Sequence, residues 1–122
     1  MKQQNKIKGN IGEDAAGEFL IHKGYVVIER NVYTRFGELD IIATHKNTLV
    51  FIEVKTKTGH VFGEPWEMVS KGKLYQVRKM AEQYLIRTGH AIYRTRCRID
   101  VIGVWLNYQR EVERIEHWEN LY

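Results

Sequence analysis

The two stretches that most restrict the fold are 37–44 (GELDIIAT) and 48–57 (TLVFIEVKTK), which are both rich in β-branched residues. That composition is typical of β-strands. Only the polar residues His45, Lys46 and Asn47 separate the two stretches, and such a short polar connection is typical of a turn. The sequence therefore predicts a hairpin, and the rest of the chain must pack on the sheet that contains it.

Two other segments show the periodicity of amphipathic helices. From Gly9 to about Lys23, apolar residues recur along one helical face: Ile11, Ala15, Ala16, Phe19 and Leu20. From about Ser70 to Thr88 a second apolar stripe follows, with Ser70 as the candidate N-cap and Gly89 as the stop: Leu74, Val77, Ala81, Tyr84 and Leu85. We expect the second stripe to pack on the sheet.

Three further segments, 25–31, 97–106 and 110–118, are also predicted strands. The segment 97–106 (CRIDVIGVWL) is apolar on both faces and is expected inside the sheet. The segment 58–67 contains two glycines and the only proline, so it is expected to be a loop. The predicted order is αβββαββ, an α/β fold that forms a single domain over residues 1–122.

Composition excludes several classes of protein. The chain has 122 residues, 43% of them hydrophobic and 28% charged, which suits a folded domain that needs no disulfides. No stretch is apolar enough to cross a membrane, so no membrane association is expected. The polar N-terminal segment and the single cysteine, Cys97, favour the cytoplasm, and the apolar run that Cys97 opens predicts a buried thiol. A net charge of +4 favours polyanionic partners.

Charged residues interrupt both strands of the predicted hairpin. Glu53 and Lys55 are two residues apart and therefore project from the same face of their strand. If the two strands pair through the turn, Asp40 lies near the level of Glu53. Two carboxylates and one ammonium group would then converge. Such a set can hold Mg²⁺ or Mn²⁺ through oxygen and can orient a water for attack on a phosphodiester.

An ordinary structural interpretation competes with this one. A Glu-x-Lys pair on a strand is often solvated, and Glu13, on the first predicted helix, is favoured near a helix N-terminus without any ligand. On the second helix, Lys73 and Gln76 lie either on a solvated flank or on the wall of the same cleft. The apolar setting favours a site, because a buried carboxylate is costly without a cation.

Two more acidic residues lie on predicted strands. Glu38 alternates onto the face of Asp40, and it is either a neighbour of the site or a carboxylate at the edge of a turn. Asp100 lies in the apolar segment 97–106 and needs a partner there, for which Arg98 is the nearest candidate. We therefore predict a structural role for Asp100.

Several motifs together resemble a known family. GEDAAGEFLIHKGYVVIERN, GELDIIA, FIEVKTK, FGEP and CRIDVIGV run along nearly the whole chain and resemble the uncharacterised bacterial YraN family. That family is similar to the restriction-endonuclease-like superfamily, which has a D…(D/E)xK signature, and within it to the archaeal Holliday-junction resolvases. The resemblance implies a mixed central sheet of about five strands flanked by helices.

The resemblance also implies roles for individual residues. Asp40 and Glu53 match the acidic positions of the signature and would be metal ligands, and Lys55 matches the catalytic lysine. Glu13 matches the helix glutamate of the resolvases and would be a further metal ligand. Gln76 matches a helix position that many members of the superfamily fill with a polar residue. The implied cofactor is Mg²⁺ or Mn²⁺.

These observations favour a metal-dependent nuclease that acts on structured or branched DNA. A nucleic-acid-binding module without cleavage and a scaffold that contacts other proteins are the alternatives. Several basic residues fit a nucleic-acid partner, beside Lys55 itself: Lys57, Lys71, Lys73, Arg78 and Lys79. DNA against RNA, and a homodimer as the unit that makes paired cuts, are left open by the sequence.

Overall fold

A computed structural model describes residues 2–59, 69–91 and 94–121 of the chain. The elements follow in the order α1 (Lys2–His22), β1 (Val26–Thr34), β2 (Gly37–His45), β3 (Thr48–Thr58), α3 (Lys71–Arg87), β4 (Cys97–Leu106) and β5 (Val112–Trp118). The predicted α/β class and the order αβββαββ are confirmed. Strand β3 continues to Thr58, and most of the predicted loop 58–67 lies outside the described residues.

The five strands form one sheet in the order β1-β2-β3-β4-β5. Strands β3 and β4 are parallel, whereas the other three neighbouring pairs are antiparallel. The sheet is therefore mixed, as expected. A parallel pair needs a crossover connection, and α3 lies in the one between β3 and β4. Strand β4 has a partner on each side, which confirms the interior position predicted from its apolar sequence.

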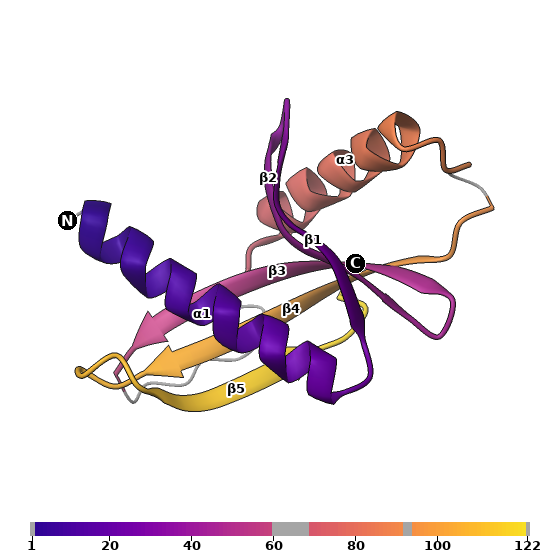
Figure 1. Cartoon of the computed structure of the whole chain (residues 1–122). Helices are drawn as coiled ribbons and strands as arrows, with labels where there is room; N and C mark the ends of the chain where they lie inside the picture. Colours follow the sequence, from indigo (N-terminus) through magenta and orange to yellow (C-terminus); the bar gives the residue numbers. More distant parts are fainter. Residues whose placement is uncertain (1, 60–68, 92–93, 122) are drawn as a thin grey trace.

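The two helices cover opposite faces of the sheet (Figure 1). On β3, Leu49 and Phe51 pack in the cluster that contains the buried side of α3. Val50 and Ile52 pack in the cluster that contains Ala16 and Leu20 of α1. Because side chains alternate along a strand, the odd-numbered residues of β3 face α3 and the even-numbered ones face α1.

The helix boundaries agree with the sequence in one case and differ in the other. Helix α3 has its N-cap at Ser70, whose side-chain Oγ accepts a hydrogen bond from the backbone N–H of Lys73 at 3.1 Å. Helix α1 begins at Lys2, earlier than the predicted start at Gly9. The added turns consist largely of lysine and glutamine, which favour helix without forming an apolar stripe, so periodicity did not reveal them.

Two properties of single segments complete the description. Cys97 is exposed, so the prediction of a buried thiol was wrong; the residue is the first of β4, where the strand has not yet entered the core. Within the described ranges, neither helix is long and apolar enough to span a membrane.

Candidate functional site

The candidate site lies where β2 and β3 separate. Their ladder runs from His45↔Thr48 to Ile41↔Ile52. Just beyond it, Oδ2 of Asp40 accepts a hydrogen bond from the backbone N–H of Val54 at 2.9 Å. Figure 1 shows β1 and β2 turning away from the rest of the sheet towards α3. At the opening between the two strands, the Asp40 carboxylate therefore replaces a backbone carbonyl as the acceptor of this hydrogen bond.

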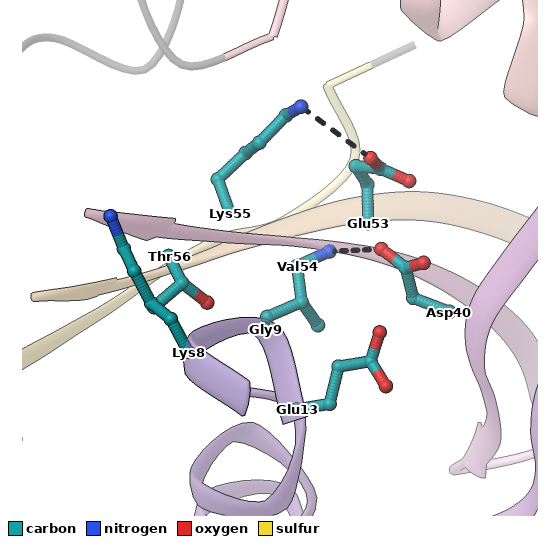
Figure 2. A pocket seen from close by; sticks show the side chains of 8 residues that line it. All are labelled: Lys8, Gly9, Glu13, Asp40, Glu53, Val54, Lys55 and Thr56. Atoms are coloured by element: carbon teal, nitrogen blue, oxygen red, sulfur yellow. Dashed lines mark hydrogen bonds and ion pairs between the residues drawn. The ribbon is translucent and has the colours of Figure 1, made fainter. Parts of the chain in front are cut away.

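A cavity of about 320 Å³ occupies this opening. Figure 2 shows its walls, which come from α1, β2 and β3: Lys8, Gly9, Glu13, Asp40, Glu53, Val54, Lys55 and Thr56. Asp40, Glu53, Lys55 and Glu13, four of the residues that the sequence singled out, thus line one cavity. The predicted hairpin accounts for this arrangement, since it places Asp40 one step beyond the Ile41↔Ile52 pair, at the level of Glu53.

The two central carboxylates are costly to ionise. Glu53 is only 5% exposed. Burial, followed by the charge of Glu53, raises the pKa of Asp40 to about 8. Burial also raises the pKa of Glu53, although Lys73 and Lys55 oppose that effect. A proton or a bound cation between the two side chains would relieve their repulsion.

Two lysines approach Glu53 from different elements. The Nζ atom of Lys73, on α3, is 3.7 Å from Oε1 of Glu53, and the Nζ atom of Lys55, on β3, is 4.0 Å from the same oxygen. Both lysines keep about a third of their side-chain surface exposed, at 31% and 38%. Their ammonium groups therefore contact both the buried carboxylate and solvent.

A second group of carboxylates adjoins the first. Oxygen atoms of Glu13, Glu38 and Asp40 lie within 4.8 Å of one another. Glu38 is thus a neighbour of the site, and its signal in the sequence was the Glu-x-Asp spacing with Asp40. Asn31 on β1, which the sequence did not single out, donates hydrogen bonds to Glu13 and Glu38. An asparagine near the end of a predicted strand carried no signal of such a contact.

The remaining predicted residues lie at different distances from the cavity. Gln76 does not line it; its side-chain Nε2 instead donates to the carbonyl of Phe36, close to Gly37 at the start of β2. Lys57 and Lys71 are exposed. Arg78 and Lys79 both approach Glu82 on the next turn of α3. Among the predicted nucleic-acid-binding residues, Lys73 therefore has the most direct contact with the site.

The donor set fits a hard divalent cation. The carboxylate groups of Asp40, Glu53, Glu13 and Glu38 supply oxygen ligands, which Mg²⁺ and Mn²⁺ prefer to nitrogen or sulfur. The raised pKa of Asp40 is the expected sign of a carboxylate whose charge the protein leaves only partly compensated. The residues present thus suit the cofactor that the sequence implied.

The fold and the site together define a small α/β protein with an acidic cavity where strands β2 and β3 separate. By sequence, the chain belongs to the uncharacterised protein family UPF0102, whose family model matches residues 12–104. This confirms the uncharacterised bacterial family that the motifs indicated. The matched segment contains α1 from Gly12 onward, the strands β1 to β3, α3 and β4 as far as Val104, and so includes every acidic residue of the cavity.

Relatives match over essentially the full chain. The chain is 40% identical to a UPF0102 protein of Desulforamulus reducens over 121 residues, or 98% of each chain. It is 37% identical to one of Pelotomaculum thermopropionicum over 122 residues, or 100% of each chain. It is 40% identical to one of Moorella thermoacetica over 116 residues, or 95% of each chain. The relatives carry the name of the family, which states no activity.

Proposed function

We propose that this protein is a metal-dependent nuclease that hydrolyses phosphodiester bonds in structured or branched DNA. The observation that carries the proposal is the meeting of Asp40 and Glu53, from adjacent strands, in one cavity with Lys55. Both carboxylates have raised pKa values, which a divalent cation would reverse. The resemblance to the restriction-endonuclease-like superfamily, whose signature these residues match, supports the same chemistry.

Each residue has a role that follows from its position. Asp40 and Glu53 would hold Mg²⁺ or Mn²⁺, with Glu13 contributing from α1. When bound, the ion would act as a Lewis acid on the phosphate. Lys55 faces solvent beside Glu53 and would orient the attacking water and offset negative charge on the phosphate. The water oxygen bonds to phosphorus as the opposite P–O bond breaks; the water loses a proton and the leaving oxygen gains one.

The substrate class is supported by charge rather than by shape. Lys8 on α1, Lys55 on β3 and Lys73 on α3 place cationic groups around the acidic cavity from three elements. Phosphate groups of a bent or branched backbone would reach such a cavity from more than one direction. Affinity should fall as salt rises, because each phosphate contact releases counterions.

Cleavage of a defined panel of substrates tests the proposal. Labelled duplex, flap, four-way-junction and single-stranded DNA are incubated with Mg²⁺ or Mn²⁺ and resolved on denaturing gels. The unaltered protein should cut at least one branched substrate. Lys55→Ala should keep DNA and metal binding but lose cleavage by about 100-fold or more. Lys46→Ala, an exposed lysine of the β2–β3 turn, is the matched control and should cut normally.

Asp40→Asn provides the complementary arm of the same test. It should lose metal binding and cleavage together, since it removes a ligand rather than the group that orients water. If the unaltered protein cuts none of the substrates, or if Lys55→Ala cuts as fast as the Lys46→Ala control, the nuclease proposal is wrong.

A second candidate is a nucleic-acid-binding module of the same fold without cleavage. The observation that favours it is the approach of both Lys73 and Lys55 to Glu53, because two ammonium groups already compensate part of the carboxylate charge. Salt-dependent DNA binding that is insensitive to Mn²⁺, together with no cleavage, would support this candidate.

A further inference from the structure

Asn31 connects two of the acidic side chains beside the cavity. Its side-chain Nδ2 donates a hydrogen bond to Oε2 of Glu13 at 2.9 Å and another to Oε1 of Glu38 at 2.7 Å. Glu13 comes from α1 and Glu38 from β2, so a residue of β1 joins two other elements. An amide has two N–H groups on one nitrogen, and here each of them meets a different carboxylate.

The backbone of Asn31 is also unusual for a strand. Its φ is 54°, in the left-handed region that asparagine tolerates better than most residues. In the β1–β2 ladder it lies between the pairs Arg30↔Ile41 and Val32↔Leu39, opposite Asp40. The left-handed residue and the proposed metal ligand therefore occupy the same level of the hairpin, where β1 and β2 turn away from the rest of the sheet (Figure 1).

The contacts position Glu13 without cancelling its charge. An amide donates hydrogen bonds but carries no net charge, so the two contacts hold Glu13 and Glu38 close together without placing a positive charge beside them. The guanidinium group of Arg30 lies 3.7 Å from Oε2 of Glu13, the same oxygen that accepts from Asn31. Among the described residues, Oε1 of Glu13 has no hydrogen-bond or ion-pair partner. Figure 2 shows the Glu13 carboxylate pointing towards Asp40.

We propose that Asn31 is a positioning residue that holds Glu13 and Glu38 beside Asp40 and thereby sets the affinity of the site for a divalent cation. This inference rests on the proposed function, because it assumes that the cavity binds such a cation. It adds β1 to the elements that build the site and assigns a role to a residue outside the Asp…Glu-x-Lys signature.

Calorimetric titration with Mn²⁺ tests the inference. Asn31→Gly removes the amide but keeps a residue that accepts positive φ. Asn47→Gly is the matched control, because Asn47 has a φ of 64° but lies in the exposed β2–β3 turn. At a temperature where all the proteins are folded, Asn31→Gly should bind Mn²⁺ about 10-fold more weakly than the unaltered protein, the usual scale for a residue that orients ligands. Asn47→Gly should bind normally.

A double-mutant cycle separates positioning from a general loss of structure. If Asn31 acts through Glu13, the combined loss of affinity in Asn31→Gly/Glu13→Gln should be smaller than the product of the two single losses. Independent, multiplicative losses would contradict the inference.

The outcomes also separate the inference from the proposed function. If the unaltered protein binds Mn²⁺ and Asn31→Gly binds as well as Asn47→Gly, the positioning role is overturned while the proposed function stands. If the unaltered protein binds no Mn²⁺ or Mg²⁺, both are overturned.

Discussion

The fold compensates the charge of Asp100, on β4, more fully than the charges of the Asp40–Glu53 pair, on β2 and β3. Asp100, on β4, is fully buried. It accepts hydrogen bonds from Nε of Arg98 at 2.9 Å, from the backbone N–H of Asn120 at 2.9 Å and, at 2.7 Å, it contacts Nε2 of His117. Burial alone would raise the pKa of Asp100, but the hydrogen bonds from His117, Arg98 and Asn120 outweigh it and lower the pKa.

In the Asp40–Glu53 pair, Glu53 is buried and Asp40 is half-buried, and their charges are less well compensated. Among the described residues, Asp40 accepts from one backbone N–H, and the ammonium groups of two partly exposed lysines approach Glu53 at 3.7 and 4.0 Å. Burial raises the pKa values of both carboxylates, and these contacts do not offset it. Burial of an acid is therefore not what distinguishes a site from a structural network. The distinction is whether the protein supplies the compensating charge itself or leaves it to a ligand.

The largest loss of stability should come from a substitution of Asp100, the acidic residue whose charge is compensated. Asp100→Asn removes the charge that Arg98 shares, and we expect a loss of about 3 kcal/mol in the free energy of unfolding, because a buried ion pair that loses one partner leaves the other uncompensated. Urea denaturation measures it. Asp14→Asn is the control, since Asp14 pairs with Arg30 at 2.8 Å but is 67% exposed and should cost less than about 1 kcal/mol. Equal losses in the two variants would show that the buried contacts of Asp100 stabilise the fold no more than an exposed ion pair does.

The second effect concerns the docking of α1, which carries Glu13 to the cavity. A Cβ at Gly12 would overlap Oγ1 of Thr56 and would make tight contacts with the Cβ and Cγ2 atoms of the same side chain, at 3.0 and 3.1 Å. Gly12→Ala should therefore cost about 1–3 kcal/mol of unfolding free energy and weaken Mn²⁺ binding, because the helix must move away from β3. Gly17→Ala is the control: nothing lies within 4 Å of its added Cβ, and its helix propensity should leave stability unchanged or raised.

These two tests also mark what sequence could and could not predict. Alternation and a short turn were enough to place Asp40, Glu53 and Lys55 together, because hairpin register follows from local rules. The pairing of Asp100 with Arg98 was predicted from their spacing and is confirmed. The contacts of Asn31 and Gly12 were not predictable, because they depend on where α1 docks on the sheet, and that position is set by the whole core rather than by any local pattern.

The third effect is a pH dependence of opposite sign in the two groups. The pKa of Asp40 is raised in the folded protein to about 8, so without divalent ions its contribution to stability is present at low pH and is lost as pH rises towards 8. We expect a loss of about 1–2 kcal/mol between pH 5 and 8, since the half-buried side chain is partly screened by solvent. Denaturation in EDTA measures it.

Two variants separate the contributions to that profile. Asp40→Asn should make the decline towards pH 8 shallower, because it removes one of the two carboxylates whose pKa values are raised. The pKa of Asp100 is lowered, so its contribution is present above about pH 4, the usual value for an aspartate, and is lost as pH falls through the folded pKa. Asp100→Asn should therefore alter the dependence of the unfolding free energy on pH only at acidic pH. A decline towards pH 8 that is as steep in Asp40→Asn as in the unaltered protein would contradict the assignment of the raised pKa to this residue.

The smallest effect on stability should follow the loss of the lysine at the cavity. Lys55 is 38% exposed on its side chain and lies 4.0 Å from Glu53, so Lys55→Ala should change the unfolding free energy by less than about 0.5 kcal/mol. Its ammonium group is useful to a bound phosphate rather than to the fold, whereas the cations around Asp100 hold the fold itself. Urea denaturation of Lys55→Ala and Lys46→Ala side by side measures the difference. A loss in Lys55→Ala as large as that in Asp100→Asn would mean that Glu53 is compensated internally, and the contrast between the two acidic groups would disappear.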